Sequence, residues 1–294
     1  MPIATNVGGS MDLPGIQTSH TTEGETMKRS TERILTTHVG SLVRPPGLMN
    51  IMRAKESGQA YDQEELAVHV RSAVREVVQK QVAVGVDVPS DGEYGKPSFS
   101  GYVNERLSGF ERRPRDPNES PLLNWGRDRQ LFREFYEAYD RATGSASGYP
   151  VACTGPITYQ GQTAVQRDID IFKAALAGVP SEEAFIPAVA PGTIELQRRN
   201  EYYPTDEAYL FAIAEAMREE YRAIVDAGFL LQIDDPRVVT QYGMPDPAPS
   251  MADYRAFAER RVEALNHALV GIPPDRVRYH LRWGSGHGQQ VTDV

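Results

Sequence analysis

The chain has 294 residues and a mass of 32.6 kDa, and its 40% apolar and 24% charged residues are ordinary for a globular protein. It carries 40 acidic and 31 basic residues, a formal net charge of −9, which argues against a nucleic-acid-binding protein because such proteins usually show a basic stripe. The single cysteine, Cys153, excludes an internal disulfide and a four-cysteine or Cys₂His₂ zinc site. We expect Cys153 to be a small buried residue.

The first 33 residues are rich in glycine, serine and threonine and poor in large apolar residues. This composition predicts a disordered N-terminal tail over residues 1–33, followed by one domain over residues 34–294. The tail lacks the apolar region of a secretory signal. No segment reaches the ~18 consecutive apolar residues of a membrane helix, so we expect a cytoplasmic protein with no membrane partner.

Strand-like and helix-like patterns alternate along the domain. The first strand is expected at residues 34–39, and a helix with apolar residues at helical spacing follows over residues 63–84 and ends at Gly85. Residues 112–129, with many arginines and prolines, are interpreted as an excursion from the core. Further strands are predicted at residues 86–91, 150–154, 184–190, 229–233 and 277–283, and further helices at residues 131–142, 165–176, 206–227 and 251–269.

This alternation predicts parallel β-α units, and the near-continuous apolar strands predict a sheet buried on both faces. A doubly wound sheet and a barrel both satisfy the pattern, but the polar residues favour an α/β barrel of the TIM type, whose active site lies at the carboxyl ends of its strands. No glycine-rich dinucleotide or P-loop motif is present. The polar residues at strand ends are Ser41, Asp91, Glu93, Asp234, Asp235, His280 and Arg282.

Two pairs of acids follow predicted strands. Asp91 and Glu93 could form a simple turn, or could bind a substrate ammonium or accept a proton at the mouth of the barrel. Asp234 and Asp235 follow five largely apolar residues, and neither should be buried without a partner. We interpret the second pair as functional.

Two histidines, His38 and His280, lie in or at the ends of predicted strands. A histidine in a strand is more often a hydrogen-bonded core residue than a ligand. His280 is the stronger candidate for function because a glycine-rich loop follows it. Side chains alternate along a strand, so Arg282 is expected on the same face as His280.

Four motifs, in chain order, resemble the cobalamin-independent methionine synthase family, in its catalytic C-terminal barrel and its single-domain relatives. They are Leu35 to Pro45, similar to the opening strand and loop; Ser90-Asp91-Gly92-Glu93; Leu231-Gln232-Ile233-Asp234-Asp235-Pro236, similar to Gln-Ile-Asp-Glu-Pro; and Tyr279 to Gly284, similar to the segment with the His-x-Cys motif.

The resemblance implies zinc-dependent transfer of a methyl group from 5-methyltetrahydropteroyltriglutamate to homocysteine, giving methionine. Zinc holds the substrate thiol as a thiolate, the reactive form. By the same resemblance, Val39, Gly40 and Ser41 hold the amino-acid part of homocysteine, and Glu93 and Asp234 hold its amino group.

The departures from the family pattern concern the metal. His280 corresponds to the first zinc ligand, but Arg282 stands where the next ligand, a cysteine, is expected, and arginine cannot ligate zinc. The later ligands have no counterpart, and residues 195–200 lack the family's tryptophan. The sequence therefore predicts an incomplete barrel without its last strands, poor zinc binding and little activity.

Other functions stay open at this point. The chain could transfer an alkyl group to a thiol without an ammonium, such as coenzyme M, or it could be a non-catalytic remnant whose exposed strand edges favour association. A weaker hypothesis is a Mg²⁺ or Mn²⁺ site of carboxylates. That site would use Asp91, Glu93, Asp234 and Asp235.

Overall fold

The computed structural model describes residues 27–114, 131–143, 151–243 and 249–282. No helix within these ranges is long and apolar enough to cross a membrane. The expected tail therefore lies mostly outside the described residues. Its last part is described, and there Arg33 forms a two-pronged ion pair with Asp87, with N–O distances of 2.7 and 2.8 Å.

The central sheet is parallel and follows the chain order. It contains β3 (Phe185–Val189), β5 (Leu230–Asp234) and β6 (Val277–His280), in the order β3-β5-β6. Isolated parallel bridges continue the array from Phe185 to Ser90 and from Val88 to Thr37. Five segments thus lie side by side in the order in which the chain reaches them.

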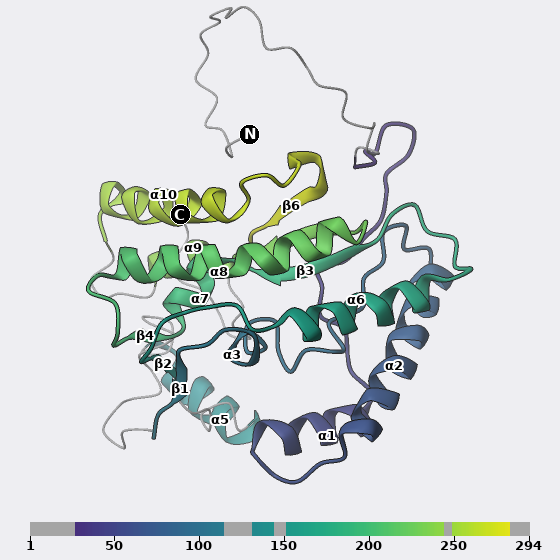
Figure 1. Cartoon of the computed structure of the whole chain (residues 1–294), viewed down its shortest axis with the longest axis horizontal. Coiled ribbons are helices and arrows are strands. Elements are labelled where there is room, and N and C mark those ends of the chain that lie inside the picture. The colour runs from purple at the N-terminus through teal and green to yellow at the C-terminus, as the bar shows by residue number, and fades with distance from the viewer. Residues whose placement is uncertain (1–26, 115–130, 144–150, 244–248, 283–294) are drawn as a thin grey trace, which may run out of the picture.

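A second small sheet lies apart from the first and is seen at the left of Figure 1. Its order is β1 (Phe110–Arg112), β2 (Val151–Cys153) and β4 (Arg199–Asn200). β2 pairs antiparallel with β1 and parallel with β4. The strand predicted at residues 150–154 therefore exists, but it does not belong to the central parallel array.

Helices cover the central sheet in chain order. α2 (Gln63–Ala83) packs against α6 (Gln162–Leu176), α6 against α8 (Asp206–Asp226), and α8 against α10 (Met251–Ala268) and the strands β3 and β5. Asp62 and Thr205 cap α2 and α8 by accepting backbone N–H bonds. The other α-helices of the described residues are α1 (Pro46–Glu56), α3 (Val103–Arg106), α5 (Arg133–Thr143), α7 (Pro191–Leu196) and α9 (Pro236–Thr240). Two 3₁₀ turns, η3 (Gln241–Gly243) and η4 (Pro274–Arg276), are also described.

Three predicted strands differ from the structure. The strand predicted at residues 86–91 is present only as isolated bridges at Val88 and Ser90. Residues 34–39 form no strand beyond the bridge at Thr37, because the Asp87 carboxylate binds the Thr36 backbone N–H at 2.7 Å where a ladder bond would otherwise form. The strand predicted to reach residue 283 ends at His280. The α/β class is confirmed, but no closed barrel is formed by the residues that the structure describes.

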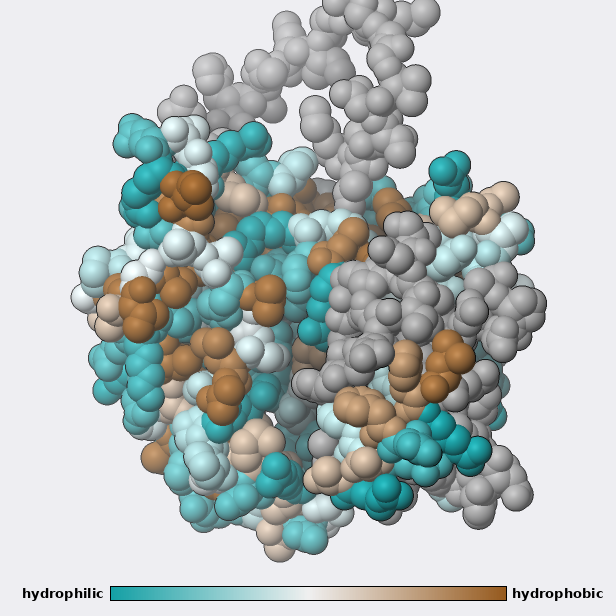
Figure 2. Space-filling model, turned by 180° about the vertical axis from the view of Figure 1, so that it is seen from behind, coloured by the Kyte–Doolittle hydropathy of each residue, from teal (hydrophilic) through white to brown (hydrophobic). Residues whose placement is uncertain are grey.

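Exposed apolar side chains are dispersed over the molecule. Figure 2 shows them as separate brown patches among hydrophilic side chains on one face. Those with the greatest exposure include Val43, Ile34 and Val84. Isolated exposed apolar residues of this kind are normal for a globular protein.

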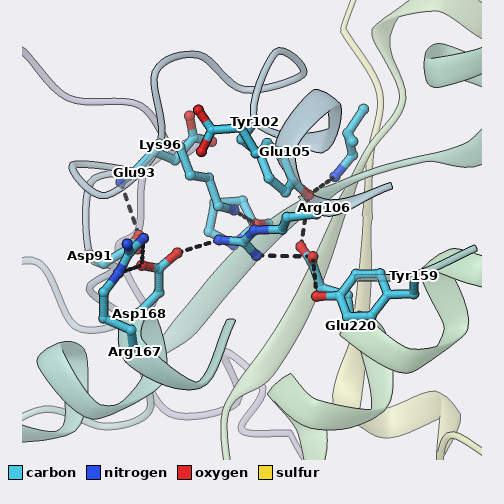
Figure 3. A network of polar contacts seen from close by, with 12 residues as sticks. Asp91, Glu93, Lys96, Tyr102, Glu105, Arg106, Tyr159, Arg167, Asp168 and Glu220 are labelled. Carbon is cyan, nitrogen blue, oxygen red and sulfur yellow. Dashed lines mark hydrogen bonds and ion pairs between the residues drawn. The ribbon is translucent and has the colours of Figure 1, made fainter. Parts of the chain in front are cut away.

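A buried charge network joins three helices (Figure 3). Arg106 of α3 pairs with Asp168 of α6 and, at 2.9 Å, with Glu220 of α8, and all three side chains are buried. Tyr102 and Tyr159 donate hydroxyl bonds of 2.9 and 2.8 Å to the two oxygens of Glu220. Every oxygen of this carboxylate is therefore hydrogen-bonded, which a buried charge requires.

We expect the substitution Arg106→Leu to lower the free energy of unfolding by about 3–5 kcal/mol, because it leaves two buried carboxylates without their shared cation. The matched control is Lys55→Ala, which removes a partly exposed pair with Glu105 and should cost less than about 1 kcal/mol. Urea denaturation followed by circular dichroism measures both. Equal losses in the two variants would contradict a structural role for the network.

Candidate active site

The candidate site lies where the parallel segments end. Glu93 follows the bridge at Ser90, Asp234 ends β5, and His280 ends β6. The chain from Gly40 to Ser41 follows the bridge at Thr37 and contacts Glu93. The structure therefore brings the polar ends of four neighbouring segments together.

Glu93 has an unusual backbone. Its φ is +60°, and it is the one non-glycine residue with a positive φ among the described residues. The Asp91 carboxylate accepts the Glu93 N–H at 2.9 Å, and the Arg44 guanidinium donates to the Glu93 carbonyl at 2.8 Å. Left-handed backbone at a residue with a Cβ costs energy and is often found at functional sites.

The Glu93 side chain faces the loop at residues 40–41. The Ser41 hydroxyl donates to one oxygen of its carboxylate, and a Cβ at Gly40 would lie 3.0 Å from the other oxygen. Gly40 also has a φ of +140°, which favours glycine. The loop approaches the carboxylate so closely because Gly40 has no side chain.

Asp234 is tied to the same loop from the opposite side. It accepts from Gln232 Nε2 at 2.9 Å and lies 2.8 Å from His280 Nδ1. Gln232 Nε2 also donates to the Val39 carbonyl at 2.7 Å. Val39 thus reaches the site through its backbone, since its side chain is 58% exposed.

Burial controls the protonation of these acids. It raises the pKa of Glu93, although Lys96 and the Ser41 hydrogen bond act to lower it. It also raises the pKa of Asp234, although the hydrogen bonds from His280 and Gln232 and the charge of Lys96 act to lower it. Burial also raises the pKa of Asp91 to about 6. Repulsion between like charges adds to this effect: Asp234 raises the pKa of Glu93, and Asp168 and Glu93 raise the pKa of Asp91.

Lys96 is the buried ammonium beside the acids. It donates to the Pro187 carbonyl of β3 and lies 4.4 Å from the centre of the Tyr102 ring. Figure 3 shows Lys96 and Tyr102 side by side. Its charge lowers the pKa of Asp91, Glu93 and Asp234 alike. The same charge also lowers the pKa of Asp168 and Glu220, so one ammonium acts on five buried carboxylates, and no hydrogen bond joins it to any of them among the described residues.

The two neighbouring acids at the end of β5 do not act together. Asp235 accepts from the Thr193 hydroxyl at 2.7 Å and from Tyr279 at 2.9 Å, so it is held away from Asp234. Within the described ranges, no three His, Cys, Asp or Glu side chains are grouped so that they could hold a metal ion. The hypothesis of a four-carboxylate Mg²⁺ or Mn²⁺ site is wrong for this reason.

The described residues also do not fit a zinc ion. His280 bonds Asp234 through Nδ1, which leaves its Nε2 able to ligate a metal. Arg282 cannot be the second ligand, its guanidinium lies 5.6 Å from the centre of the Phe99 ring, and no group of three His, Cys, Asp or Glu side chains in the described ranges could hold the ion. Because β6 ends at His280, strand alternation does not extend to Arg282 as predicted. Cys153 is fully buried in the small sheet, as expected of a packing residue.

Three residues of this site were not predicted from the sequence as parts of it. Gln232 lies inside a recognised motif, so its spacing from Asp234 could have indicated a role. Arg44 and Lys96 follow no spacing rule, because each acts on the site through a loop conformation. His38, expected to be a hydrogen-bonded core histidine, is bonded to Gln81 at 2.7 Å.

Comparison with known proteins adds independent information. No family model matches the chain. It is 28% identical over 250 residues to a methionine synthase of Sulfolobus acidocaldarius and 24% identical over 238 residues to that of Pyrococcus furiosus. The fold is similar to a B12-independent methionine synthase of Listeria monocytogenes, with a TM-score of 0.58 and 23% identity.

The chain is similar in sequence to methionine synthases, and its fold is similar to those of B12-independent methionine synthases. A second similar structure is the B12-independent methionine synthase of Shewanella sp. W3-18-1, with a TM-score of 0.56 and 18% identity over 78% of this chain and 55% of that one. The Listeria match covers 85% of this chain and 66% of that one. The resemblance to the methionine synthases is therefore confirmed.

The chain spans about three fifths of the length of the curated methionine synthases that it matches. The Sulfolobus alignment covers 85% of this chain and 61% of the relative, and the Pyrococcus alignment covers 81% and 58%.

The backbone of Glu93 leads to a direct test. Glu93→Gly and Glu93→Ala remove the same carboxylate, but only alanine keeps a Cβ at a φ of +60°. We expect the glycine variant to be more stable than the alanine variant by about 1 kcal/mol, measured by urea denaturation at pH 8. An alanine variant that equals or exceeds the glycine variant would show that this backbone is not strained.

Proposed function

We propose that the acid pair Glu93 and Asp234 binds the ammonium group of homocysteine, and that the chain takes part in methyl transfer from 5-methyltetrahydropteroyltriglutamate to that amino acid. The observation that carries the proposal is the convergence of two buried carboxylates on one loop, Val39 to Ser41, at the ends of parallel segments. The relatives named methionine synthase support the reaction class.

The local charge balance supports a cationic ligand group. Lys96 is the ammonium that acts on Asp91, Glu93 and Asp234 together, and its hydrogen bond goes to a backbone carbonyl. The Arg44 guanidinium likewise donates to the carbonyls of Glu93 and Lys96. Lys96 and Arg44 thus act on these acids from a distance, and a ligand ammonium would form direct charge-assisted hydrogen bonds to Glu93 and Asp234, which are strong.

The other parts of the site have matching chemistry. The Ser41 hydroxyl and the glycine backbone at residue 40 lie beside Glu93, where the amino-acid end of a ligand would be held. The similar Shewanella structure is a complex with selenomethionine, which has the same ammonium and carboxylate groups as homocysteine. Binding at Glu93 and Asp234 would orient the thiol without contributing to its ionisation.

The strand order supports a barrel of the TIM type as the frame of this site. The five parallel segments run in chain order from Thr37 to β6, and the helices α2, α6, α8 and α10 are neighbours in the same order. Barrels of this type place their active sites at the carboxyl ends of the strands, as here.

The donor set argues against zinc as the activator of the thiol in this chain. Of the two positions that the family pattern places here, His280 could ligate a metal only through Nε2, because its Nδ1 bonds Asp234, and Arg282 cannot ligate a metal at all. No step of the reaction is therefore assigned to a metal. We propose that these residues bind the amino acid and that methyl transfer by this chain is slow.

Calorimetric titration tests the ammonium site. Homocysteine is compared with 4-mercaptobutanoate, which lacks the amino group, and with coenzyme M. We expect homocysteine to bind at least about 10-fold more tightly than the other two, because each lost charge-assisted hydrogen bond costs about 1.5–3 kcal/mol. Glu93→Gln and Asp234→Asn should each weaken homocysteine binding about 10-fold or more.

The control for these variants is Asp235→Asn, which changes the neighbouring buried acid that faces Thr193 and Tyr279. It should leave the dissociation constant for homocysteine within about 3-fold, since Asp235 contacts other partners. Tighter binding of coenzyme M would favour alkyl transfer to a thiol without an ammonium. Binding of none of the three thiols would overturn the proposed function.

The metal content is a separate prediction. Purified chain, dialysed against micromolar zinc, should contain well below one zinc per chain by plasma mass spectrometry, and methyl transfer to homocysteine should be slow. Arg282→Cys, which adds a thiolate near His280, should retain more zinc than the control Arg282→Ser. Stoichiometric zinc in the unchanged chain would contradict the expectation.

A further inference from the structure

His38 lies just before the loop that joins the two carboxylates, and its contacts fix which of its nitrogens carries a proton. Its Nε2 lies 2.7 Å from Gln81 Oε1, and its Nδ1 accepts the Gly40 N–H at 3.2 Å. An imidazole nitrogen that accepts an N–H bond carries no proton. The neutral ring must therefore be protonated at Nε2.

Gln81 independently requires the same tautomer. Its Nε2 amide group donates to the carbonyls of Ser90 and Val77, at 2.8 and 3.2 Å, so the orientation of this buried amide is settled. Its Oε1 then accepts from the Ser90 N–H at 3.0 Å and faces His38 Nε2. An oxygen in this position needs a donor, so His38 Nε2 must supply the proton.

The far side of the loop contacts the site. On the Glu93 side, a Cβ at Gly40 would lie 3.0 Å from Glu93 Oε1, and the Ser41 hydroxyl donates to the Glu93 carboxylate. On the Asp234 side, the Val39 carbonyl accepts from Gln232, which also donates to Asp234. His38 therefore holds a short segment that contacts Glu93 directly and is linked to Asp234 through Gln232.

We propose that His38 is a positioning residue: its neutral imidazole holds the Gly40 N–H, and through it the backbone of residues 39–41 between Glu93 and Asp234, so that protonation of His38 releases this segment and weakens ligand binding. The effect on ligand binding rests on the proposed function of the acid pair. The tautomer and the hold on Gly40 do not depend on it.

The surroundings of His38 favour the neutral ring. Burial lowers the pKa of His38 from 6.5, the Gln81 hydrogen bond opposes this, Arg278 of β6 lowers it further, and Asp91 raises it slightly. The Phe185 ring of β3, 5.5 Å away, contributes no charge. A lowered pKa means that the neutral form and its bond to Gly40 are fully present above pH 6.5, and are lost as the pH falls through the pKa of the folded protein.

Two conservative variants separate the two nitrogens. His38→Asn places an amide oxygen near the position of Nδ1, can still accept the Gly40 N–H and cannot be protonated. His38→Gln reaches instead toward Gln81 and leaves Gly40 without its acceptor. At pH 8 we expect the asparagine variant to bind homocysteine within about 3-fold of the unchanged chain and the glutamine variant to bind about 10-fold more weakly.

The pH profile is the readout that a purely structural role would not change. Between pH 8 and pH 5.5 the unchanged chain should lose more affinity for homocysteine than His38→Asn, which lacks the His38 imidazole but keeps His280 and the carboxylates of the site. Parallel profiles, or equal binding by the asparagine and glutamine variants, would overturn the positioning role. Thermal melting at pH 8 establishes that each variant is folded.

A ligand-free measurement keeps the inference distinct from the proposed function. Long-range ¹H–¹⁵N spectra of chain labelled with ¹⁵N-histidine, assigned by comparison with His38→Asn, report the tautomer directly. We expect the Nε2–H form for His38 and a midpoint below pH 6.5. An Nδ1–H form of His38, or a titration midpoint of His38 at or above pH 6.5, would refute the inference even if homocysteine binds. If the expected tautomer is found but homocysteine does not bind, only the proposed function and the effect of His38 on the ligand are refuted.

Discussion

The fold depends on the compensation of a carboxylate that is buried on α8. Glu220 has no exposed surface, so its charge is tolerated only because Arg106 pairs with it and Tyr102 and Tyr159 donate to its oxygens. Arg106 lies in α3, Tyr102 is the residue before α3, and Tyr159 lies just before α6. Arg106 also pairs with Asp168 of α6. The network therefore sets how α3, α6 and α8 lie relative to one another.

The same network supports the candidate site through Tyr102. The ring of this tyrosine lies beneath the Lys96 ammonium, and its hydroxyl contacts Glu220 and the backbone N–H of Val189 in β3. Lys96 in turn acts on the site acids Glu93 and Asp234. The network has a cation paired directly with its carboxylates, whereas the site shares one ammonium at a distance. This difference is what suits the site to a charged ligand and the network to a structural role.

The relationship to the methionine synthases separates two properties of the site. The acid pair, the glycine loop and the glutamine of the Gln-Ile-Asp motif are present and are joined by hydrogen bonds. The described residues do not offer a metal the ligands that the family pattern predicts, because Arg282 stands where a cysteine is expected and no group of three His, Cys, Asp or Glu side chains that could hold a metal ion is present among them. Under the proposed function, the residues for amino-acid recognition are therefore joined in one site, whereas the metal ligands for thiol activation are incomplete among the described residues.

The sequence by itself determined the elements whose signals are local. Apolar spacing and a glycine stop identified α2, the Thr205 cap and Gly228 identified α8, and an apolar run identified β5, because periodicity and capping act over a few residues. It also placed Glu93, Asp234 and His280 at strand ends. Only the tertiary structure decided that Asp234 faces the site while Asp235 binds Thr193 and Tyr279, that β2 joins a separate sheet, and that Lys96 and His38 support the acids. Most of these outcomes depend on contacts between residues more than forty positions apart, which local sequence patterns do not encode.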